Sequence, residues 1–440
     1  MSERWARTIL ATYRWSGAVA YPFVGGYVAW RATRGMEDRG RHRERYGRSA
    51  IDRPDGPVVW VHAVNDSETL AVCALIGRIL ALGINIVLTT GTVSSARIAR
   101  ERLGDRVIHQ YVPLDLKPAV GRFLDHWAPD LAIIAESEIW PMTILELGDR
   151  RIPVVLVNGR MSDRAFAGWR RWPWLAEALM ENLSIAITQS EKDAERFRAL
   201  GARPVAVSGN LKTDIDPPPV DELELRRVMS QIGERPLWSA LLTHPGEEAA
   251  AGEVQKLIMA RFPGALTIIM PRDPSRGDAI ESELSAMGLN VVRRSRRDKI
   301  TGKSHVLLCD QPGESGLCLR LSDIAFFGGS LLGKGGENPI DAIALGAAVL
   351  SGQDIDYHRE IYQPLMNKGG VRLVRDKEML AGAVNYLLRN EEARRKIADG
   401  GAAALKGMRG ALDLTVRSLE PFIHPLVVKA RLDSGSKHRR

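Results

Sequence analysis

The stretch "IAFFGGSLLGKGGENPIDAIALG", residues 324–346, joins an apolar run to an apolar helical pattern through a loop rich in glycine. Ile324 to Phe327 predicts a short buried strand. Asn338 and Pro339 are typical of an N-cap and a first helical position before a helix from Ile340 to Leu345. Glycine lets backbone N–H groups approach a ligand closely, and a helix N-terminus favours negative charge. The stretch therefore indicates a phosphate-binding loop, or else an ordinary strand-to-helix turn with spare glycines.

The same alternation of strand and helix recurs along most of the chain. Short runs rich in Val and Ile are separated by helical stretches such as 70–82 and 119–126. The predicted strands are "PVVWVHAV", "INIVLTTG", "LAIIAE", "IPVVLVN" and "IAITQS", followed by "LWSALLT", "LTIIMP", "LNVVRR", "SHVLLCD", "IAFFGG" and "AAVLSG". This alternation is typical of parallel, doubly wound sheets. The proline-rich stretch 214–222, "DIDPPPVDE", predicts a linker. We therefore expect two Rossmann-like α/β domains that face each other across a ligand-binding cleft.

Composition and charge limit the class of protein. The chain has 440 residues, enough for two domains of common size. Cys73, Cys309 and Cys318 show no paired metal-ligand spacing, so we expect neither a zinc site nor a disulfide framework, and a reducing compartment fits best. The formal net charge of +8 is concentrated at the ends, in residues 39–48 and 429–440. Basic ends suit an anionic membrane surface or nucleic acid, and a solvated tail is the alternative for the last ten residues.

Residues 15–30, "WSGAVAYPFVGGYVAW", are uncharged and need a separate interpretation. The segment is shorter than the roughly 20 residues of a membrane-spanning helix, and Pro22 interrupts it. It also lacks the small-residue cleavage site of a signal peptide. Trp15 and Trp30 at its ends, with arginines on both sides, favour a segment that lies in the cytoplasmic membrane interface. A true span and a buried packing helix are the alternatives.

Eight motifs along the chain occur together in one protein family. They are "WVHAVNDSE", "ESEIWP", "VNGRMSDR", "TQSEKDAERFRALGA", "VSGNLKTD", "LTHPGEE", "PRDP" and "GGSLLGKGGENP". In order and approximate spacing they resemble the Kdo transferases, membrane-associated glycosyltransferases that attach 3-deoxy-D-manno-octulosonic acid (Kdo) to the lipid A precursor in Gram-negative bacteria. The resemblance runs from about residue 10 to residue 425.

The resemblance implies a GT-B fold and an inverting reaction that needs neither metal nor cofactor. It implies CMP-Kdo as donor, the lipid A precursor (lipid IVA) as acceptor, no nucleic-acid partner, and the cytoplasmic face of the inner membrane as location. The expected parts of the chain are a membrane anchor with a basic segment (1–50), an acceptor-binding domain (51–215), a CMP-Kdo-binding domain (216–425) and a basic tail (426–440).

Glu68 is the candidate catalytic base. It lies just past the predicted strand "PVVWVHAV", near the start of the helix containing 70–82, where a carboxylate is placed to take a proton from a sugar hydroxyl. The alternative is a helix-opening acid after a possible N-cap at Ser67. The resemblance favours the base, because the family's catalytic base is the Glu that ends this motif.

Glu136, Glu138 and Lys212 are the other catalytic candidates. Glu136 and Glu138 end a predicted strand two residues apart, so they point to the same side if the strand continues. The resemblance implies that Glu136 assists the transition state and that Glu138 supports it. Lys212 resembles the family's basic partner, and a lysine suits a departing phosphate or the Kdo carboxylate. A solvated loop lysine is the alternative.

The candidate donor-binding residues lie in the second half. Arg272 directly follows a predicted strand, where a guanidinium would grip the cytidine phosphate, and Glu314 is a candidate for cytosine or ribose contacts. By resemblance, the glycine loop is the donor phosphate cradle and Asp341 reaches a ribose hydroxyl. The full set is Pro271, Arg272, Pro312, Gly313, Glu314, Gly329, Ser330, Asn338, Pro339, Ile340 and Asp341.

One short motif is typical of metal-dependent enzymes. Asp214 and Asp216 form the Asp-x-Asp of metal-dependent glycosyltransferases, but they lie in the predicted linker ahead of three prolines. We therefore expect no metal there.

Several residues depart from the family pattern. Asn65-Asp66-Ser67-Glu68 stands where Ser-Val-Gly-Glu is usual, Asp273 and Glu337 each replace a histidine, Asp341 is a shortened acid, and Gln311-Pro312 replaces Thr-Met. Added acids near a phosphate weaken binding unless they are paired. A diverged, weakly active or inactive relative that binds nucleotide or lipid A is therefore the second hypothesis.

Overall fold

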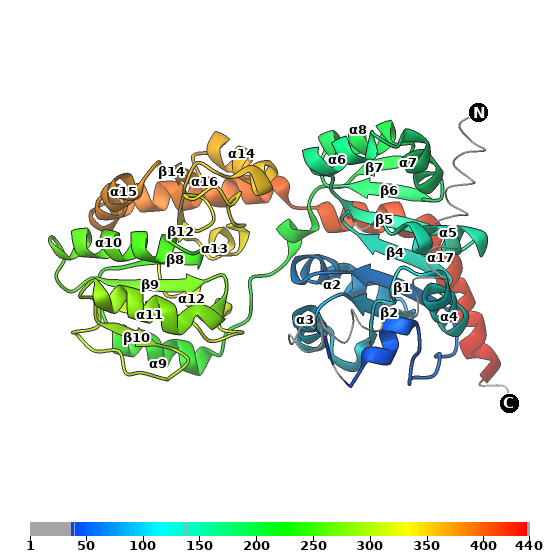
Figure 1. Cartoon of the computed structure of the whole chain (residues 1–440), viewed down its shortest axis with the longest axis horizontal. Coiled ribbons are helices and arrows are strands. Elements are labelled where there is room, and N and C mark those ends of the chain that lie inside the picture. Colours follow the sequence, from blue (N-terminus) through cyan, green and yellow to red (C-terminus); the bar gives the residue numbers. More distant parts are fainter. Residues whose placement is uncertain (1–36, 39, 138, 438–440) are drawn as a thin grey trace. The chain divides into compact units, whose positions relative to one another are not determined.

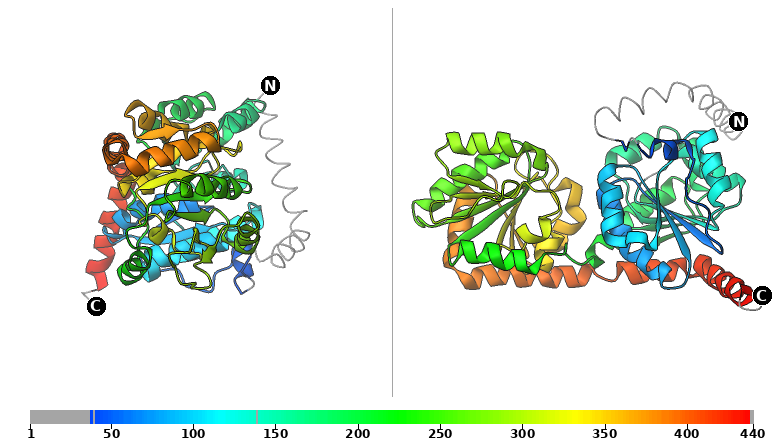
Figure 2. Two further views of the ribbon diagram at one scale, coloured as in Figure 1. Left: turned by 90° about the vertical axis from the view of Figure 1, so that its left-hand side faces the viewer. Right: turned by 90° about the horizontal axis from the view of Figure 1, so that it is seen from below.

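The computed structural model describes residues 37–38, 40–137 and 139–437 (Figure 1). The chain divides into two compact units, an N-terminal unit of residues up to 215 together with those from 409, and a C-terminal unit of residues 216–408. The boundary between residues 215 and 216 lies in the predicted linker, as expected. In both units, helices lie on both faces of a parallel sheet (Figure 2).

The N-terminal unit is built on one parallel sheet with strand order β3-β2-β1-β4-β5-β6-β7 in the described residues. The strands are β1 Val58–Ala63, β2 Asn85–Thr90, β3 Ile108–Tyr111, β4 Leu131–Ala135, β5 Val154–Gly159, β6 Ile185–Thr188 and β7 Val205–Val207. The helices are α2 Asp66–Leu80, α3 Val93–Leu103, α4 Lys117–Trp127, α5 Pro141–Asp149, α6 Asp163–Trp169, α7 Pro173–Met180, α8 Glu191–Ala199 and α17 Ala411–Lys437, with 3₁₀ helices η1 His42–Tyr46, η2 Gly104–Arg106 and η3 Leu211–Asp214.

Strand β1 shows how the sheet is buried on both faces. Val59 and Val61 pack with α2, α3 and α17, whereas Val58 and Trp60 pack with α4, α5, α7 and α8. Consecutive strand residues point to opposite faces, so a strand covered on both sides must be apolar throughout. This is why "VVWV" is a continuous apolar run.

Helix α17 corrects two of the expected boundaries. Leu419, Ile423 and Leu426 are buried against the N-terminal sheet. Residues 409–425, which we assigned to the CMP-Kdo-binding domain, therefore belong to the N-terminal unit. The expected basic tail from residue 426 is helical as far as Lys437.

Part of the basic segment 39–48 is folded onto the N-terminal sheet. Arg45 in η1 is 6% exposed and pairs with Glu37 through two hydrogen bonds of 2.9 and 3.0 Å. Its other guanidinium N–H groups donate to the backbone oxygens of Val112 and Gly91. Arg45 is thus a structural residue of this unit and is not available to a membrane surface.

The C-terminal unit has a second parallel sheet, with order β10-β11-β9-β8-β12-β13-β14 in the described residues. The strands are β8 Leu237–Thr243, β9 Leu266–Pro271, β10 Val291–Arg293, β11 Val306–Leu308, β12 Ile324–Phe327, β13 Ala348–Ser351 and β14 Val371–Leu373. The helices are α9 Glu222–Ile232, α10 Glu247–Met259, α11 Gly277–Ala286, α12 Ser315–Cys318, α13 Ile340–Ala344, α14 Arg359–Asn367, α15 Lys377–Arg389 and α16 Glu391–Met408, with 3₁₀ helices η4 Pro274–Arg276 and η5 Asp356–His358.

Two apolar clusters enclose this sheet. Trp238 and Ala240 of β8 pack with α10, α11 and α15 on one face, and Leu241 packs with α9, α12, α13, α14 and α16 on the other. The parallel strands end together at one edge of the sheet. That edge carries the end of β9 and the loops after β9, β11 and β12, where the predicted donor-binding residues lie.

Among the described residues, no helix is long and apolar enough to cross a membrane. The apolar segment 15–30, for which we predicted an interfacial anchor, lies outside the described residues.

Candidate functional site

Glu68 lies in the first turn of α2 and closes the N-terminus of that helix. Asn65 is the N-cap, where we expected Ser67: its Oδ1 accepts a hydrogen bond from the Glu68 N–H at 3.0 Å. Asn65 Nδ2 donates to Glu68 Oε1 at 2.6 Å, and the Val64 N–H donates to Glu68 Oε2 at 2.7 Å. The carboxylate is thus held in the manner of a capping box, with Glu68 2% exposed. Each carboxylate oxygen has a second lone pair, so this structural role leaves a base role open.

The added acid beside this carboxylate is paired. Asp66 Oδ1 accepts hydrogen bonds from the Ser94 hydroxyl at 2.7 Å and the Ser95 hydroxyl at 2.9 Å. Both serines lie in the first turn of α3. The negative charge of Asp66 is therefore turned towards α3 and held by hydroxyl donors there.

His62 in β1 contributes no positive charge to this edge of the sheet. Burial lowers the pKa of His62 to about 4, so the imidazole is neutral at pH 7. Its Nδ1 lies 2.9 Å from the Thr89 hydroxyl, and the ring stands edge-on to the Trp140 ring at 5.4 Å between centroids. The side chain therefore acts as a packing group.

Two of the candidate catalytic residues, Glu136 and Lys212, form an ion pair in the structure. Lys212 Nζ donates to Glu136 Oε1 at 2.6 Å, and the two side chains are 11% and 12% exposed. Strand β4 ends at Ala135, and Glu136 has a left-handed backbone with φ of 55°. The strand therefore does not continue through Glu136, so the condition for Glu136 and Glu138 to share a side is not met. Glu138 lies outside the described residues.

Sequence reasoning missed a residue that joins this pair. Asn158, next to last in β5, is fully buried and donates from Nδ2 to Glu136 Oε1 at 3.3 Å. Its Oδ1 accepts a hydrogen bond from the Leu211 N–H at 2.9 Å. The available signal was a polar residue that ends a strand inside the motif "VNGRMSDR".

Asp214 of the Asp-x-Asp is a helix cap. Its Oδ1 accepts from the Gly410 N–H at 2.8 Å and its Oδ2 from the Leu412 N–H at 2.7 Å, at the start of α17. Within the described residues, no group of three or more His, Cys, Asp or Glu side chains is arranged to hold a metal ion. The contacts of Asp214 therefore support a structural role as the cap of α17.

In the C-terminal unit, Arg272 follows Pro271 at the end of β9 and has 58% of its side chain exposed. Its Nε lies 3.5 Å from Glu337 Oε1, which is also 3.0 Å from His244 Nε2. Sequence reasoning noted Glu337 only as a departure and did not identify His244. Asp273, another added acid, accepts from the N–H and hydroxyl of Ser275.

The glycine loop after β12 holds one of the chain's own carboxylates. Glu247, 1% exposed, accepts from the N–H groups of Gly329 at 2.7 Å, Ser330 at 3.2 Å and Leu331 at 3.2 Å. A Cβ at Gly328 would lie 2.5 Å from the Leu242 oxygen and 2.7 Å from Glu247 Oε2, so glycine is required there. The expected cradle exists, but these three amides already bind Glu247.

The predicted nucleotide loop after β11 is also internally paired. Arg294 donates to both carboxylate oxygens of Glu314, at 2.9 and 2.7 Å, and to Glu224 at 2.7 Å. Gly313, beside Pro312, has a left-handed φ of 89°. The Glu314 carboxylate that we expected to contact cytosine or ribose is therefore engaged by Arg294.

Helix α13 begins where the sequence predicted. It spans Ile340–Ala344, with Pro339 as N-cap, one position later than the expected Asn338. Asn338 Oδ1 still accepts from the Ile340 N–H at 3.0 Å. Asp341 lies in the first turn of this helix.

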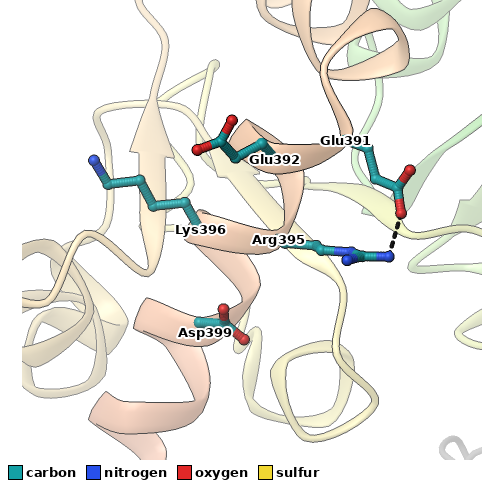
Figure 3. A pocket seen from close by; sticks show the side chains of 5 residues that line it. All are labelled: Glu391, Glu392, Arg395, Lys396 and Asp399. Carbon is teal, nitrogen blue, oxygen red and sulfur yellow. Dashed lines mark hydrogen bonds and ion pairs between the residues drawn. The ribbon is translucent and has the colours of Figure 1, made fainter.

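A surface hollow of about 810 Å³ lies elsewhere in the C-terminal unit, along α16 (Figure 3). It is lined by charged side chains, among which Glu391 and Arg395 form an ion pair. The lining residues are Glu391, Glu392, Arg395, Lys396 and Asp399. None of these lining residues is a predicted site residue. A helix face that carries only charged side chains is typical of a surface in contact with solvent.

Comparison with known proteins gives one consistent family. A family model described as 3-Deoxy-D-manno-octulosonic-acid transferase (kdotransferase) matches residues 40–215. A 3-deoxy-D-manno-octulosonic acid transferase of Haemophilus influenzae is 29% identical over 418 residues, covering 92% of this chain and 96% of that protein. A protein of Arabidopsis thaliana named "Probable 3-deoxy-D-manno-octulosonic acid transferase, mitochondrial" is 32% identical over 397 residues, covering 86% of this chain and 89% of that protein.

Solved structures agree on the fold. A glycosyltransferase from Rickettsia africae matches with a TM-score of 0.57 and 10% identity, over 84% of this chain and 99% of that one. A UDP-GlcNAc 2-epimerase from Neisseria meningitidis matches with a TM-score of 0.56 and 15% identity, over 82% and 99%. At such identities the likeness concerns the fold alone, and it confirms the predicted GT-B class.

Proposed function

This chain belongs to the 3-deoxy-D-manno-octulosonic acid transferase family, and from that premise we propose that it transfers Kdo from CMP-Kdo to the lipid A precursor with inversion at the anomeric carbon. The chain is a glycosyltransferase. The identity of the acceptor as lipid IVA and the inversion are parts of the proposal.

One observation carries the catalytic assignment. Strands β1 and β4 are neighbours in the sheet, with His62 paired to Ile134, and each is followed at its carboxyl end by a predicted catalytic carboxylate. Glu68 follows β1 and is fixed by its helix cap, and Glu136 follows β4 and is fixed by Lys212. Ligands of open α/β sheets bind at the carboxyl ends of the strands. Two oriented carboxylates at this edge are suited to acid–base and charge-stabilising chemistry.

In the proposed reaction the acceptor hydroxyl oxygen bonds to the anomeric carbon of Kdo while the bond from that carbon to the phosphate oxygen of CMP breaks. Glu68 takes the hydroxyl proton, and CMP leaves from the opposite face. Glu136 stabilises the positive charge that develops on the sugar ring, and Lys212 holds Glu136 in place and offers a cation to the Kdo carboxylate or the departing phosphate.

Donor binding is proposed for the C-terminal unit. The exposed guanidinium of Arg272 is suited to grip the cytidine phosphate, and the surrounding loops carry Pro271, Pro312, Gly313, Asn338, Pro339, Ile340 and Asp341. Because Arg272 and Lys212 supply positive charge, we propose that no metal or other cofactor is required.

We also propose that the enzyme works at the cytoplasmic face of the inner membrane, because its acceptor is a lipid and because residues 15–30 have the aromatic and basic flanks of an interfacial segment. The second hypothesis, an inactive relative, loses its main argument. Asp66 and Asp273 accept hydrogen bonds from serine donors, and Glu337 lies 3.5 Å from Arg272 Nε, so each of these added acids has a partner within its own unit.

The test compares two substitutions. Glu68→Gln cannot accept a proton, so turnover with CMP-Kdo and the lipid A precursor should fall by roughly 10² to 10⁴-fold while CMP binding stays nearly unchanged. Arg272→Ala should instead weaken CMP binding by about 1.5–3 kcal/mol. Steady-state kinetics and calorimetric titration with CMP separate the two effects.

The control addresses the second role of Glu68 as a helix cap. Ser190→Ala removes the N-cap of α8 in the same unit and leaves both carboxylates intact. If Ser190→Ala lowers turnover as much as Glu68→Gln does, or if the wild type transfers no Kdo, the catalytic assignment is wrong.

A further inference from the structure

Asn158 occupies an unusual position for a polar side chain. It is fully buried in β5, the strand that pairs with β4, and its backbone is left-handed with φ of 53°. Asparagine tolerates this conformation better than most residues, because its short polar side chain bonds locally. Because its side-chain amide is buried, Asn158 is expected to find its hydrogen-bond partners within the protein.

Those hydrogen bonds join separate segments of the chain. The Asn158 Nδ2 group donates to Glu136 Oε1 at 3.3 Å, after β4. Its Oδ1 accepts from the Leu211 N–H at 2.9 Å, at the start of η3. Its backbone oxygen accepts from Gln189 Nε2 at 3.1 Å, after β6. One side chain therefore links the loop that carries Glu136 to the turn that carries Lys212.

The two links converge on a single atom. Glu136 Oε1 receives Asn158 Nδ2 on one side and Lys212 Nζ, at 2.6 Å, on the other. Both bonds use the same oxygen, and Oε2 makes no hydrogen bond among the described residues. The carboxylate is thereby oriented by one oxygen while the other remains free for a substrate. The backbone of Glu136 is also in the left-handed conformation, and a strained conformation of this kind is kept only where surrounding contacts stabilise it.

We propose that Asn158 is a positioning residue for the transfer reaction, which fixes the Glu136 carboxylate and the Lys212 turn in one geometry. This inference rests on the proposed roles of Glu136 and Lys212. The chemistry requires an amide at this position. A carboxylate would accept from Leu211 but could not donate to Glu136, and an aliphatic side chain would do neither.

The test uses a substitution of nearly equal shape. Asn158→Asp keeps the acceptor for Leu211 and tolerates the left-handed backbone, but it replaces the donor with a negative charge facing Glu136. We expect kcat to fall by about 10- to 100-fold, as is found when a reacting group is misplaced. The KM for CMP-Kdo should change by less than about threefold, because Asp still accepts from Leu211 and so keeps the Lys212 turn in place, and the proposed donor-binding residues of the C-terminal unit are unchanged.

Two comparisons separate positioning from general damage. Val155→Ala weakens the packing of the same strand without touching the Glu136 network, and it should leave kcat within about threefold of wild type. In a Glu136→Gln background, Asn158→Asp should lower kcat by less than about threefold, because a residue that acts through Glu136 has little left to position. If the two losses multiply instead, or if Val155→Ala reproduces the effect, the proposal is overturned.

A second readout requires no turnover. Amide hydrogen exchange of the peptide that contains Leu211 should be faster in Asn158→Ala, which loses the acceptor, and unchanged in Asn158→Asp, which keeps it. If the wild type transfers no Kdo, the proposed function fails, and this exchange pattern alone decides whether Asn158 anchors the Lys212 turn. Equal exchange in all three proteins would show that it does not.

Discussion

At the scale of single residues, buried carboxylates determine how the predicted binding loops fold. The glycine loop was predicted to be either a phosphate cradle or an ordinary turn, and three of its N–H groups bind the Glu247 carboxylate. Backbone N–H groups in such a loop attract an anion, and here the anion is a carboxylate of the protein itself. Which anion fills the loop depends on a residue more than eighty positions earlier in the chain, and neither spacing nor composition indicates that pairing.

Replacing this carboxylate gives the first prediction at this scale. Glu247→Gln would turn an amide NH₂ group towards N–H donors, so at least one buried bond is lost and the rest are weakened. We expect the free energy of unfolding to fall by about 2–3 kcal/mol. Glu253→Gln on the same helix is the control, because its ion pair with Lys377 is exposed and contributes little. Thermal unfolding measures both, and equal melting temperatures for the two variants would contradict the prediction.

Two histidines, His62, which is buried, and His109, which is partly buried, give the second prediction. Burial lowers the pKa of His62 to about 4 and that of His109 to about 3, both below the ordinary value of 6.5. The unfolded chain therefore binds protons first, so this stability is fully present above about pH 6.5 and is lost as the pH falls towards the folded-state values.

The N-terminal unit should accordingly lose up to about 1.4 kcal/mol per histidine for each pH unit below 6.5. Melting temperatures between pH 7.5 and pH 5 measure this loss. His109→Gln removes one of the two groups, and it should make the decline less steep. A variant whose decline matches that of the wild type would show that His109 is not the cause.

At the scale of elements, the interior strands of each sheet were predictable, and of the four edge strands only β10 was. Every predicted strand is present, because strands covered on both faces must be continuously apolar. The strands that the sequence did not reveal are β3, β7 and β14, and all three lie at sheet edges. An edge strand is short and partly solvated, so "IHQY" and "VAV" carry no clear pattern.

The candidate site likewise contains residues that could be predicted from the sequence and one that could not. Glu136 and Lys212 could each be named as candidates from the motifs around them, but their contact with each other could not be predicted from those motifs. Asn158 was not predicted, since its role depends on contacts from β5 to two distant segments. The helix caps Asn65 and Asp214 could not be predicted either. Several polar residues stand near each helix start, and the sequence alone does not indicate which of them makes the capping hydrogen bonds.

The cap of α17 provides a prediction at this scale. Asp214→Ala removes two hydrogen bonds from the first turn of the helix, so stability should fall by about 1–2 kcal/mol and amide exchange near residue 412 should accelerate. Asp216→Ala is the matched control from the same Asp-x-Asp, and it should change neither quantity. Loss of turnover on treatment with EDTA, restored by magnesium and abolished equally by both substitutions, would return this motif to a metal-binding role.

At the scale of the whole molecule, the chain passes between the two units twice. The first passage, at residues 215 and 216, was predictable from its prolines. The second, at residues 408 and 409, has no comparable composition, and only the burial of Leu419 and Ile423 against the N-terminal sheet reveals it. A boundary that is set by the packing of one long helix is therefore not visible as a linker in the sequence.

The last prediction concerns how the whole molecule reaches its lipid substrate, and it depends on where the chain is cut. Deleting residues 1–35 removes the proposed interfacial segment but keeps Glu37, which pairs with the buried Arg45. The truncated protein should move from the membrane to the soluble fraction and should still bind CMP, because the deletion leaves every described strand of both sheets in the chain.

The matched control deletes residues 1–37 and so leaves Arg45 buried without its carboxylate partner. Breaking a buried ion pair from one side costs about 3–5 kcal/mol, so this second truncation should lower the melting temperature of the protein while the first should not. If the 1–35 truncation still sediments with membranes at high salt, another surface of the folded units binds the lipid. That result would remove the interfacial assignment while leaving the transferase assignment in place, since the assignment to the family extends over most of the chain.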